Sequence, residues 1–521
     1  MGTFRASRDV RSDRANPPGG FFFDKMGLIK GLAAALILFQ MAGLSKWLGL
    51  PLIDEHSFRQ TQTALSAYWI YHEGYTFDYI TPVLGFPWAI PFEFPLYQLL
   101  VAWLAKGLPF LGLDASARIV SWVFSLLVLG PLWKITLRYG REPLLGYAAV
   151  CLYLASPFQI TWGRSCMIES TALFLSLMTL WRFIRLGDRP TLANAALAVF
   201  WGAPAALVKA TTPPVFLLLG CAHVIAVGWR REGRRSWRPL VTAFLPAGLI
   251  AAAVFGWTHQ ADAVKAANPL GALLTSEALT AWNFGGLAQK LSLPQWYAFL
   301  KRSIKAIVTP TGLIFITLWL IWMRGRLIPR YRLMGLAGIG AFLATVGLFT
   351  NLHFVHSYYQ YSCAVFLTFA IACFLVGVRD DIHLRRRSLA LLGLCLLMAV
   401  TAALAETKRI RKLDYSAYEA GLAAESLTRR DSAIIVLGAD WSSAIQYYAR
   451  RKGLTLPAWG YDRMPADSLP LDTMGGLPID AVVLYQYNRM SEADKRFADE
   501  IKSRWPGLNS ARVGETEILH R

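Results

Sequence analysis

Two adjacent carboxylates, Asp54 and Glu55, directly follow the first long apolar run of this 521-residue sequence. A carboxylate at a membrane surface can act as general base towards a hydroxyl or an amine, or can bind a metal ion. The alternative is that the two acids only begin a helix, where the helix dipole favours negative charge. Because His56 and Arg59 lie in the same segment, a functional site is favoured. Asp54, Glu55 and His56 are candidate ligands for Mg²⁺ or Mn²⁺, although carboxylates here do not demand a metal.

Glu169 and Lys209 stand next to apolar runs, where ionised side chains are rare. Glu169 follows Arg164 in the segment 162–170 and directly precedes an apolar run. An ionised group at that depth is costly and usually functional, so a functional role is favoured over a cap of the next helix. Lys209, in the segment 207–214, could equally contact a phosphate as a point charge or extend its ammonium group to the interface from a helix end.

Two further segments combine polar and aromatic side chains. Glu93, in the segment 92–97, precedes a proline, and a helix start explains it as well as a functional role does. The segment 351–361 contains two histidines and three tyrosines, and this density of donors suggests a surface for phosphate or sugar hydroxyls. Two histidines three positions apart are a weak signal for a metal, because no third ligand is nearby. The candidate residues of this segment are His353, His356, Tyr358 and Tyr359.

Membrane-spanning helices must position these residues. Hydrophobic residues make up 55% of the chain and charged residues 17%, against about 25% charged residues in soluble domains. Apolar runs of about 17–23 residues are each long enough to cross a bilayer as a helix. This pattern excludes a soluble enzyme with one small core, a disordered chain and a disulfide scaffold. We expect about eleven spans, at 27–49, 115–134, 144–160, 170–185, 191–208, 213–229, 239–256, 306–323, 333–350, 361–378 and 388–405.

Arginine and lysine residues cluster in alternate connections between these spans. By the positive-inside rule, the basic connections face the cytoplasm. The N-terminus is therefore expected inside, and an odd number of spans places the C-terminal segment outside. The same loops explain the net charge of +20, so no nucleic-acid partner is expected. The basic connections carry Arg5, Arg8, Arg11, Arg14 and Lys25; Lys134, Arg138 and Arg141; Arg182, Arg185 and Arg189; Arg230, Arg231, Arg234, Arg235 and Arg238; Arg324, Arg326, Arg330 and Arg332; and Arg379, Arg385, Arg386 and Arg387.

The charge pattern divides the chain into three parts. Residues 1–26 are expected to form a cytoplasmic N-terminal tail, and residues 27–405 a transmembrane catalytic domain. Its first outer loop, 50–114, contains two half-apolar stretches, 64–72 and 95–108, that we expect to be helices lying in the interface. Residues 406–521 are expected to form a small extracytoplasmic α/β domain. Its predicted strands are 432–438 and 480–485, and its predicted helices are 441–451 and 491–505.

This topology places all the candidate residues on the outer face, where helix packing could bring them around one cavity. Acids beside cationic and aromatic donors at the lipid boundary suit a substrate with a lipid tail and an anionic head. The sequence has no phosphate-binding GxxxxGK[ST] loop, no DxD pair, no HExxH and no GxSxG. Nucleotide chemistry and serine or zinc hydrolysis are therefore unsupported.

The order and spacing of five motifs resemble the GT-C membrane glycosyltransferases. The resemblance is to the protein O-mannosyltransferase and aminoarabinose-transferase group, a family 39-like set. The motifs are DEHSFRQTQTA from Asp54, EFPLYQ from Glu93, GRSCMIES from Gly163, VKATTPP from Val208 and HSYYQY from His356. The resemblance implies an α-helical polytopic fold of the GT-C type and transfer of a sugar from a polyprenyl-phosphate carrier, with inversion, to an acceptor. Glu93 stands where the aminoarabinose enzymes carry a lysine, which puts that substrate assignment in doubt.

The resemblance also implies roles for individual residues. Asp54 would be the general base or would position the acceptor, Glu55 would support it, and Glu169 would be a second acid. Lys209 and the turn with His356, Tyr358 and Tyr359 would hold the carrier phosphate. Further candidates for binding the donor and its phosphate are Arg59, Glu93, Arg164 and His353.

The sequence is compatible with two functions of different class. The first is an inverting glycosyltransferase of the cytoplasmic membrane, with a polyprenyl-phosphate sugar and an unknown acceptor as substrates and the bilayer as its environment. The second is a transporter or flippase of lipid-linked sugars. The sequence shows no inverted repeat and no paired broken helices, which disfavours the transporter.

Overall fold

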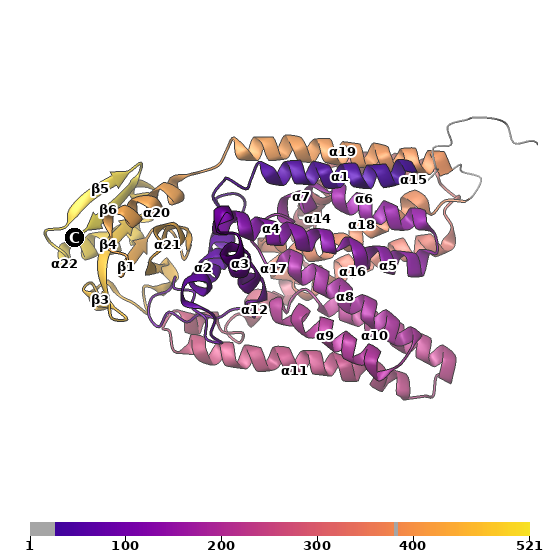
Figure 1. The fold of residues 1–521 in the computed structure, drawn as a ribbon, viewed down its shortest axis with the longest axis horizontal. Helices are drawn as coiled ribbons and strands as arrows, with labels where there is room; N and C mark the ends of the chain where they lie inside the picture. Colours follow the sequence, from indigo (N-terminus) through magenta and orange to yellow (C-terminus); the bar gives the residue numbers. More distant parts are fainter. Residues whose placement is uncertain (1–26, 380–383) are drawn as a thin grey trace, which may run out of the picture.

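The computed structural model describes residues 27–379 and 384–521. The predicted tail, residues 1–26, lies outside these ranges. Figure 1 shows a helical body joined at one end to a small sheet domain that holds the C-terminus. The expected fold class, a polytopic helical protein with a small α/β domain after it, is confirmed. The protein is a multi-pass integral membrane protein.

Helices cover at least part of every predicted span. Several of them begin with a proline in the first two positions, where the missing N–H has no helical partner to lose. The helices of the body are α1 (Gly27–Ser45), α2 (Ser57–Glu73), α3 (Leu96–Gly107), η1 (Pro109–Leu111), α4 (Gly112–Leu127), α5 (Leu129–Gly140), α6 (Pro143–Ala155), α7 (Pro157–Trp162), α8 (Glu169–Asp188), α9 (Leu192–Val208), α10 (Pro214–Glu232), α11 (Arg238–Ala266), η2 (Gly271–Leu274), α12 (Thr280–Phe284), α13 (Leu287–Leu291), α14 (Leu293–Ile307), α15 (Pro310–Trp322), α16 (Pro329–Leu348), α17 (Thr350–Val355), η3 (Ser357–Gln360), α18 (Tyr361–Val376) and α19 (Leu384–Ile410).

Within the described ranges, seven helical segments are long and apolar enough to cross a membrane. The pair α14 and α15, bent by 92°, would make an eighth, while α6 and α9 are apolar but shorter. The predicted count of eleven spans is therefore not confirmed. The seven segments are α1, Pro109–Gly140, α10, α11, α16, Ser357–Val376 and α19.

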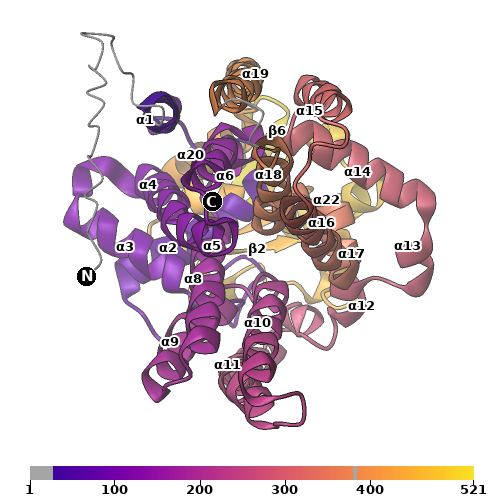
Figure 2. The same cartoon turned by 90° about the vertical axis from the view of Figure 1, so that its right-hand side faces the viewer.

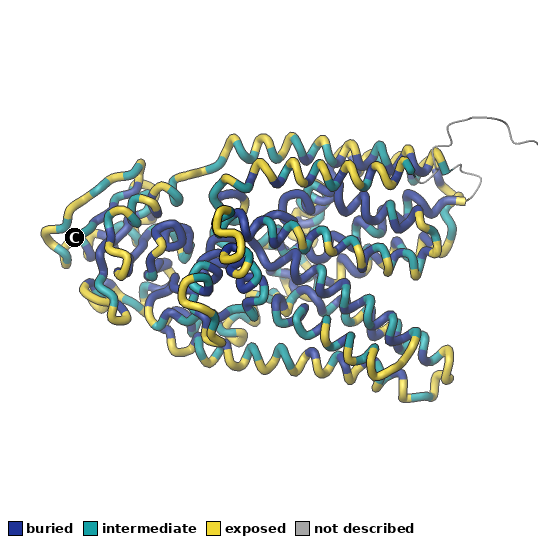
Figure 3. The backbone as a smooth tube through the Cα atoms, viewed as in Figure 1, coloured by how far each residue is buried: buried dark blue, intermediate teal, exposed yellow. Residues whose placement is uncertain are grey.

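Large apolar side chains on the outer helices face away from the protein. Figure 3 shows exposed positions that recur along α1, α11 and α19. Leu38 is 63% exposed, Phe255 75% and Leu404 68%. In a soluble protein such a surface would be unfavourable, but in a bilayer it contacts lipid tails. In Figure 2, seen along the helices, α9, α10 and α11 extend to one side of the bundle and α14 to α17 to another.

The C-terminal domain is a mixed sheet with helices. Its strands run in the order β2-β1-β4-β6-β5, with β1 parallel to β2 and β4, β6 antiparallel to β4 and β5, and β3 added to β4. The predicted strands and helices of this domain are confirmed as β1, β4, α21 and α22. The elements are α20 (Ser416–Leu427), β1 (Ala433–Leu437), α21 (Ala444–Ala449), β2 (Lys452–Leu456), η4 (Ala458–Gly460), η5 (Ala466–Ser468), β3 (Thr473–Met474), β4 (Leu477–Leu484), η6 (Tyr487–Arg489), α22 (Glu492–Arg504), β5 (Asn509–Val513) and β6 (Thr516–His520).

The sheet domain packs on the segment 46–114 of the helical body. The Leu52 N–H donates to the Tyr448 hydroxyl at 2.5 Å, and the hydroxyls of Thr61 and Ser443 lie 3.0 Å apart. Leu84 forms an isolated β-bridge with Leu454. The stretches predicted as interfacial helices are α2 and α3 of this segment, although α2 begins at Ser57, before the predicted start at 64. The sheet domain therefore holds the segment that carries Asp54.

Candidate active site

Asp54 is the centre of a network of charged side chains, the Asp54 cluster, at the end of the helical body next to the sheet domain. Its Oδ1 accepts from Gln60 Nε2 at 2.8 Å and from Arg118 Nη2 at 3.2 Å, and its Oδ2 accepts from Arg164 Nη1 at 2.8 Å. Asp54 is only 6% exposed. Both carboxylate oxygens are thus engaged. The members of the cluster are Asp54, Glu55, Arg118, Arg164, Glu406 and Arg409.

Asp54 and its two arginine partners come from three separate parts of the chain. Asp54 follows α1, Arg118 lies on α4, and Arg164 lies between α7 and α8. His56 adopts φ 54°, a left-handed conformation uncommon for non-glycine residues. This sharp turn directly precedes α2. The Asp54 side chain contacts Gln60, Arg118 and Arg164, whereas the His56 ring packs on Tyr358. Gln60 of α2 accepts the Cys166 N–H at 2.9 Å, which ties α2 to the segment that carries Arg164.

The two arginines control the charge of Asp54. Burial raises the pKa of Asp54, but the attraction and hydrogen bonds of Arg118 and Arg164 outweigh it and leave the pKa well below its ordinary value. Asp54 is therefore ionised at neutral pH, as a general base must be. It is also a weak base while both arginines hold it. Its assignment as the general base stays a prediction.

The far side of the cluster is built by the end of α19. Glu406 accepts from Arg164 Nη2 at 2.6 Å and from the Trp47 indole N–H at 2.9 Å. The Arg164 guanidinium also lies 3.7 Å from the centre of the Trp47 ring, a cation–π contact. Arg409 contacts Glu406 and donates to Glu55 at 2.8 Å. Glu55 therefore joins the same network as Asp54 through Arg409.

A second set of side chains, the Lys209 cluster, lies beside the first. Lys209 Nζ pairs with Glu169 Oε1 at 2.5 Å and lies 4.0 Å from the centre of the Tyr359 ring. Lys209 is 5% exposed and Glu169 2%. Glu169 Oε2 is buried and has no hydrogen-bond partner among the described residues. The members of the cluster are Glu169, Lys209, His56, His356, Tyr358 and Tyr359.

Stacked aromatic rings complete the Lys209 cluster. The ring centres of His56 and Tyr358 are 5.0 Å apart, and those of Tyr358 and Tyr359 are 4.8 Å apart. Burial lowers the pKa of His56, and it lowers the pKa of His356 to about 4, helped by His56, Arg59 and Lys209. Both imidazoles are neutral at pH 7, so the positive charge here belongs to lysine and arginine.

Arg59, Glu93 and His353 lie at the edges of the Lys209 cluster. Arg59 forms an ion pair with Glu93, and attraction to Glu93, Tyr358, Tyr359 and Glu169 raises the pKa of Arg59 despite its burial. Arg302 of α14 donates to the His353 carbonyl at 2.7 Å. Burial, with Lys209 and Arg302, lowers the pKa of His353 to about 3.

The suggested metal site does not fit this geometry. Asp54 faces two arginines, Glu55 faces Arg409, and His56 packs on Tyr358. Over residues 27–379 and 384–521, no three His, Cys, Asp or Glu side chains are grouped to hold a metal ion.

The structure arranges the predicted residues in two adjoining clusters. Trp162 lies between them, with its ring centre 5.6 Å from that of His56, while Thr161 beside it donates to Glu406. Asp54 and Glu55 line a cavity of about 420 Å³ with residues of α19, and Glu169 is not among its lining residues. A single cavity shared by Asp54 and Glu169 stays a prediction.

Sequence reasoning missed Arg118, Glu406 and Arg409 of the Asp54 cluster, and Arg302 at the edge of the Lys209 cluster. Arg118 and Glu406 are ionisable residues at the end of apolar runs, so the argument that selected Glu169 would also have selected them. Arg302 lies on α14, outside every predicted span and every motif. Arg302 belongs to the site only because it donates to the His353 carbonyl of α17, and no pattern in the sequence predicts that contact.

Comparison with known proteins identifies the fold of this chain through solved structures, not through its sequence. No family model and no curated protein matches the sequence. The structure of ArnT from Cupriavidus metallidurans bound to undecaprenyl phosphate matches with a TM-score of 0.63 and 14% identity, over 95% of this chain and 98% of that one. ArnT in the apo state matches with a TM-score of 0.58 and 14% identity, over the same shares. The oligosaccharyltransferase of Archaeoglobus fulgidus matches with a TM-score of 0.49 and 12% identity, over 89% of this chain and 70% of that one.

The match to ArnT runs almost from end to end of both chains, so it includes the helical body and the sheet domain together. The order of motifs in the sequence predicted the same architecture. The chain therefore has the fold of the GT-C glycosyltransferases.

Proposed function

We propose that this protein transfers a sugar from a polyprenyl-phosphate carrier to an acceptor at the extracytoplasmic face of the cytoplasmic membrane, with inversion at the anomeric carbon. The observation that carries the proposal is the pair of adjoining clusters on a GT-C fold. One cluster is suited to an anionic lipid phosphate and the other to the acceptor. Inverting transfer needs both, because a base acts on one side of the sugar and a stabilised phosphate leaves on the other.

The Lys209 cluster has the chemistry of a phosphate site. The helices α8 and α18 begin at this cluster, with Glu169 at the first position of α8 and Tyr359 just before α18, and α10 begins five residues after Lys209. Helix N-termini carry partial positive charge and favour anions. Lys209 and Arg59 add full charges, and the Tyr358 and Tyr359 hydroxyls are donors. The carrier phosphate would be held here.

Glu169 supplies an acceptor for the sugar itself. Its Oε2 is buried without a hydrogen-bond partner among the described residues. A buried polar atom in that state calls for an explanation, and a ligand donor is one. We assign this oxygen to a sugar hydroxyl of the donor. The acceptor would approach Asp54 and Glu55 through the cavity of about 420 Å³ beside α19.

The transporter alternative is not favoured by this arrangement. Alternating access needs a site near the middle of the membrane that can open to either side. Here both charged clusters lie at helix ends, since Asp54 follows the spanning helix α1 and Glu169 begins α8. A site at one face suits an enzyme whose carrier substrate already lies at that surface.

The decisive assay uses purified protein in liposomes with a panel of polyprenyl-phosphate sugars: a hexose, a pentose and an amino sugar. We expect one of them to yield free carrier phosphate together with a glycosylated acceptor from an added envelope extract. The matched control is the Asp54→Asn protein in the same liposomes. Movement of the intact donor across the bilayer with no release of carrier phosphate would identify a flippase instead.

The proposed orientation has its own test. A cysteine placed at Ser491, at the start of α22, should react with a membrane-impermeant maleimide in intact spheroplasts. The six native cysteines are all buried, so background labelling should be low. A cysteine at Arg235, in the exposed connection between α10 and α11, serves as the control and should react only after permeabilisation. The reverse pattern would invert the topology and move both clusters to the cytoplasmic face.

A further inference from the structure

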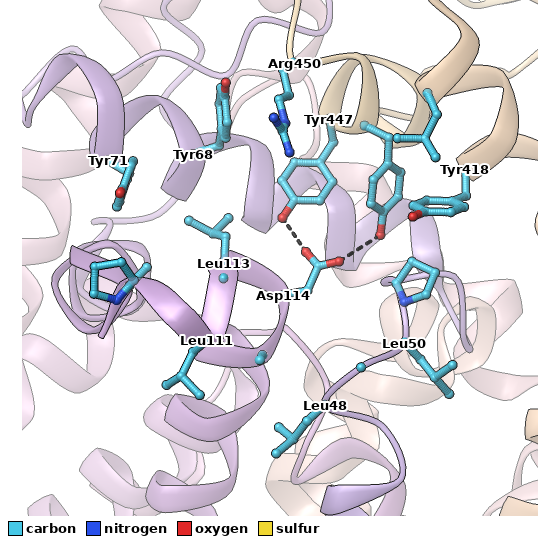
Figure 4. A pocket seen from close by; sticks show the side chains of 18 of the residues that line it. Leu48, Leu50, Tyr68, Tyr71, Leu111, Leu113, Asp114, Tyr418, Tyr447 and Arg450 are labelled. Atoms are coloured by element: carbon cyan, nitrogen blue, oxygen red, sulfur yellow. Dashed lines mark hydrogen bonds between the residues drawn. The ribbon is translucent and has the colours of Figure 1, made fainter. Parts of the chain in front are cut away.

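A separate cavity of about 510 Å³ lies between the sheet domain and the segment 46–114. Figure 4 shows it from close by. Its volume falls within the range of small-molecule sites, about 300–1,000 Å³. None of the members of the Asp54 and Lys209 clusters lines it. The lining residues that determine its polar and apolar walls include Leu48, Leu111, Leu113, Asp114, Tyr447 and Arg450.

One wall of the cavity is polar. The half-buried Asp114 carboxylate accepts hydrogen bonds from the hydroxyls of Tyr447 and, at 3.2 Å, Tyr448. In Figure 4 the Arg450 guanidinium lies beside Tyr447, above this carboxylate. A carboxylate offers lone pairs to further donors, so it can receive a ligand hydroxyl beside the two tyrosines.

The rim of the cavity is electropositive. Arg430 and Arg450 line the cavity, and Lys106 lies over the ring of the lining residue Tyr71, 5.5 Å from its centre. Burial lowers the pKa of the lining residue His72, and the three cations lower it further, whereas Glu73 raises it. Arg450 pairs with Glu425 at 3.2 Å. Within the described part of the chain, Arg430 and Lys106 have no ion-pair partner. The rim therefore offers positive charge to an anionic ligand.

The opposite wall is apolar and lies at the membrane boundary. Leu48 and Leu50 follow α1, while Leu111 and Leu113 stand at the start of the span Pro109–Gly140. Phe110, beside them, is 81% exposed. An aromatic ring that protrudes next to the start of a span is typical of a segment immersed in the lipid interface. The cavity thus opens at the depth of lipid headgroups.

We propose that this cavity binds an anionic phospholipid whose headgroup carries free hydroxyls, of the phosphatidylglycerol type. The phosphate lies between Arg430 and Arg450, a headgroup hydroxyl donates to Asp114, and an acyl chain follows the leucine wall into the bilayer. Arg450 is paired with Glu425, but the unpaired Arg430 and Lys106 favour a net negative lipid over a zwitterionic one. The site does not depend on the sugar-transfer proposal.

Such a lipid would also support the segment that carries Asp54. The Tyr448 hydroxyl that donates to Asp114 accepts the Leu52 N–H at 2.5 Å, two residues before Asp54. Arg118, one turn after Asp114 on α4, bonds the Pro51 carbonyl at 3.0 Å and Asp54 itself. A lipid in the cavity would therefore stabilise both the hydrogen bond from Leu52 to Tyr448 and the contacts of Arg118 with Pro51 and Asp54.

The test is lipid binding by the full chain in detergent, measured by native mass spectrometry with phosphatidylglycerol, phosphatidylethanolamine and phosphatidylcholine of equal chain length. We expect preferential retention of phosphatidylglycerol. The double substitution Arg430→Gln with Arg450→Gln should weaken it about tenfold or more, because it removes two charge-assisted contacts. Leu113→Trp, which fills the cavity and keeps the charges, should weaken it as well.

The matched control is Arg463→Gln with Arg496→Gln, which removes two exposed charges elsewhere on the sheet domain. It should bind phosphatidylglycerol like the unchanged protein. Equal retention of the three lipids, a preference for phosphatidylethanolamine, or equal loss in the two double variants would each overturn the proposal. So would undiminished binding to the Leu113→Trp protein. None of these results would bear on sugar transfer.

Discussion

Replacement of Asp54 by asparagine is expected to lower turnover by about 10²- to 10⁴-fold, the usual contribution of general acid–base catalysis. The amide keeps the shape of the side chain but cannot take a proton from the acceptor. Binding of the carrier lipid should survive, because Lys209 and the tyrosines that would hold the phosphate belong to the other cluster. The measurement is kcat at saturating donor, together with the affinity for polyprenyl phosphate.

The structure adds a second effect of Asp54→Asn. Removing one partner of a buried ion pair destabilises a protein by about 3–5 kcal/mol, and Asp54 is the partner of both Arg118 and Arg164. The melting temperature should therefore fall. Asp188→Asn is the matched control, since Asp188 pairs with Arg138 at 2.7 Å at the opposite end of α8, and its turnover should be unchanged. Near-normal turnover of Asp54→Asn would make Glu55 or Glu169 the next candidate for the base.

The candidate site could be located from the sequence because its residues stand at the ends of apolar runs. Glu169 and Lys209 were selected one at a time on that ground, and hydropathy and charge are both readable along a single chain. Their ion pair was not predicted, because it depends on how α8 packs against α9. In the structure the two residues are 40 positions apart in sequence and in direct contact.

The ion pairs of Asp54 could not be predicted from the sequence. The sequence predicts that Asp54 is a general base, positions the acceptor or binds a metal, but it does not predict the ion pairs of Asp54 with Arg118 and Arg164. Its partners come from α4 and from the loop before α8, and Glu406 reaches Arg164 because α19 continues to Ile410, beyond the predicted boundary at 405. Boundaries of elements are the least predictable feature of a sequence. Here a shift of a few residues brings a carboxylate into the site.

In the sheet domain, the central strands could be predicted from the sequence but the edge strand could not. The strands β1 and β4 could be predicted from their short apolar runs, and in the structure all of β1 and most of β4 are buried. The strand β5 lies at an edge of the sheet and is mostly exposed, so its polar sequence gives no strand pattern. Central strands can be predicted from hydrophobicity, whereas edge strands depend on the partner with which they pair.

Lys209→Ala is expected to weaken the affinity for polyprenyl phosphate by about 1.5–3 kcal/mol, the range for a hydrogen bond to a charged group. This corresponds to a roughly 10- to 150-fold higher Kd. The reason is that Lys209 brings a full positive charge to a buried position beside Tyr358 and Tyr359, where helix N-termini also favour an anion. Binding of the carrier lipid to the purified protein is the measurement.

This single substitution also leaves the Glu169 carboxylate buried without its cation, which by itself destabilises the fold. The double substitution Lys209→Met with Glu169→Gln removes both charges, so it should recover stability but not carrier affinity. Lys265→Met is the control, because Lys265 is a buried lysine paired with Asp262 at 2.8 Å, and its loss should lower stability alone. If the double variant recovered carrier affinity as well, the lysine would serve only to neutralise Glu169. The phosphate would then have to be held by Arg59 and the tyrosines.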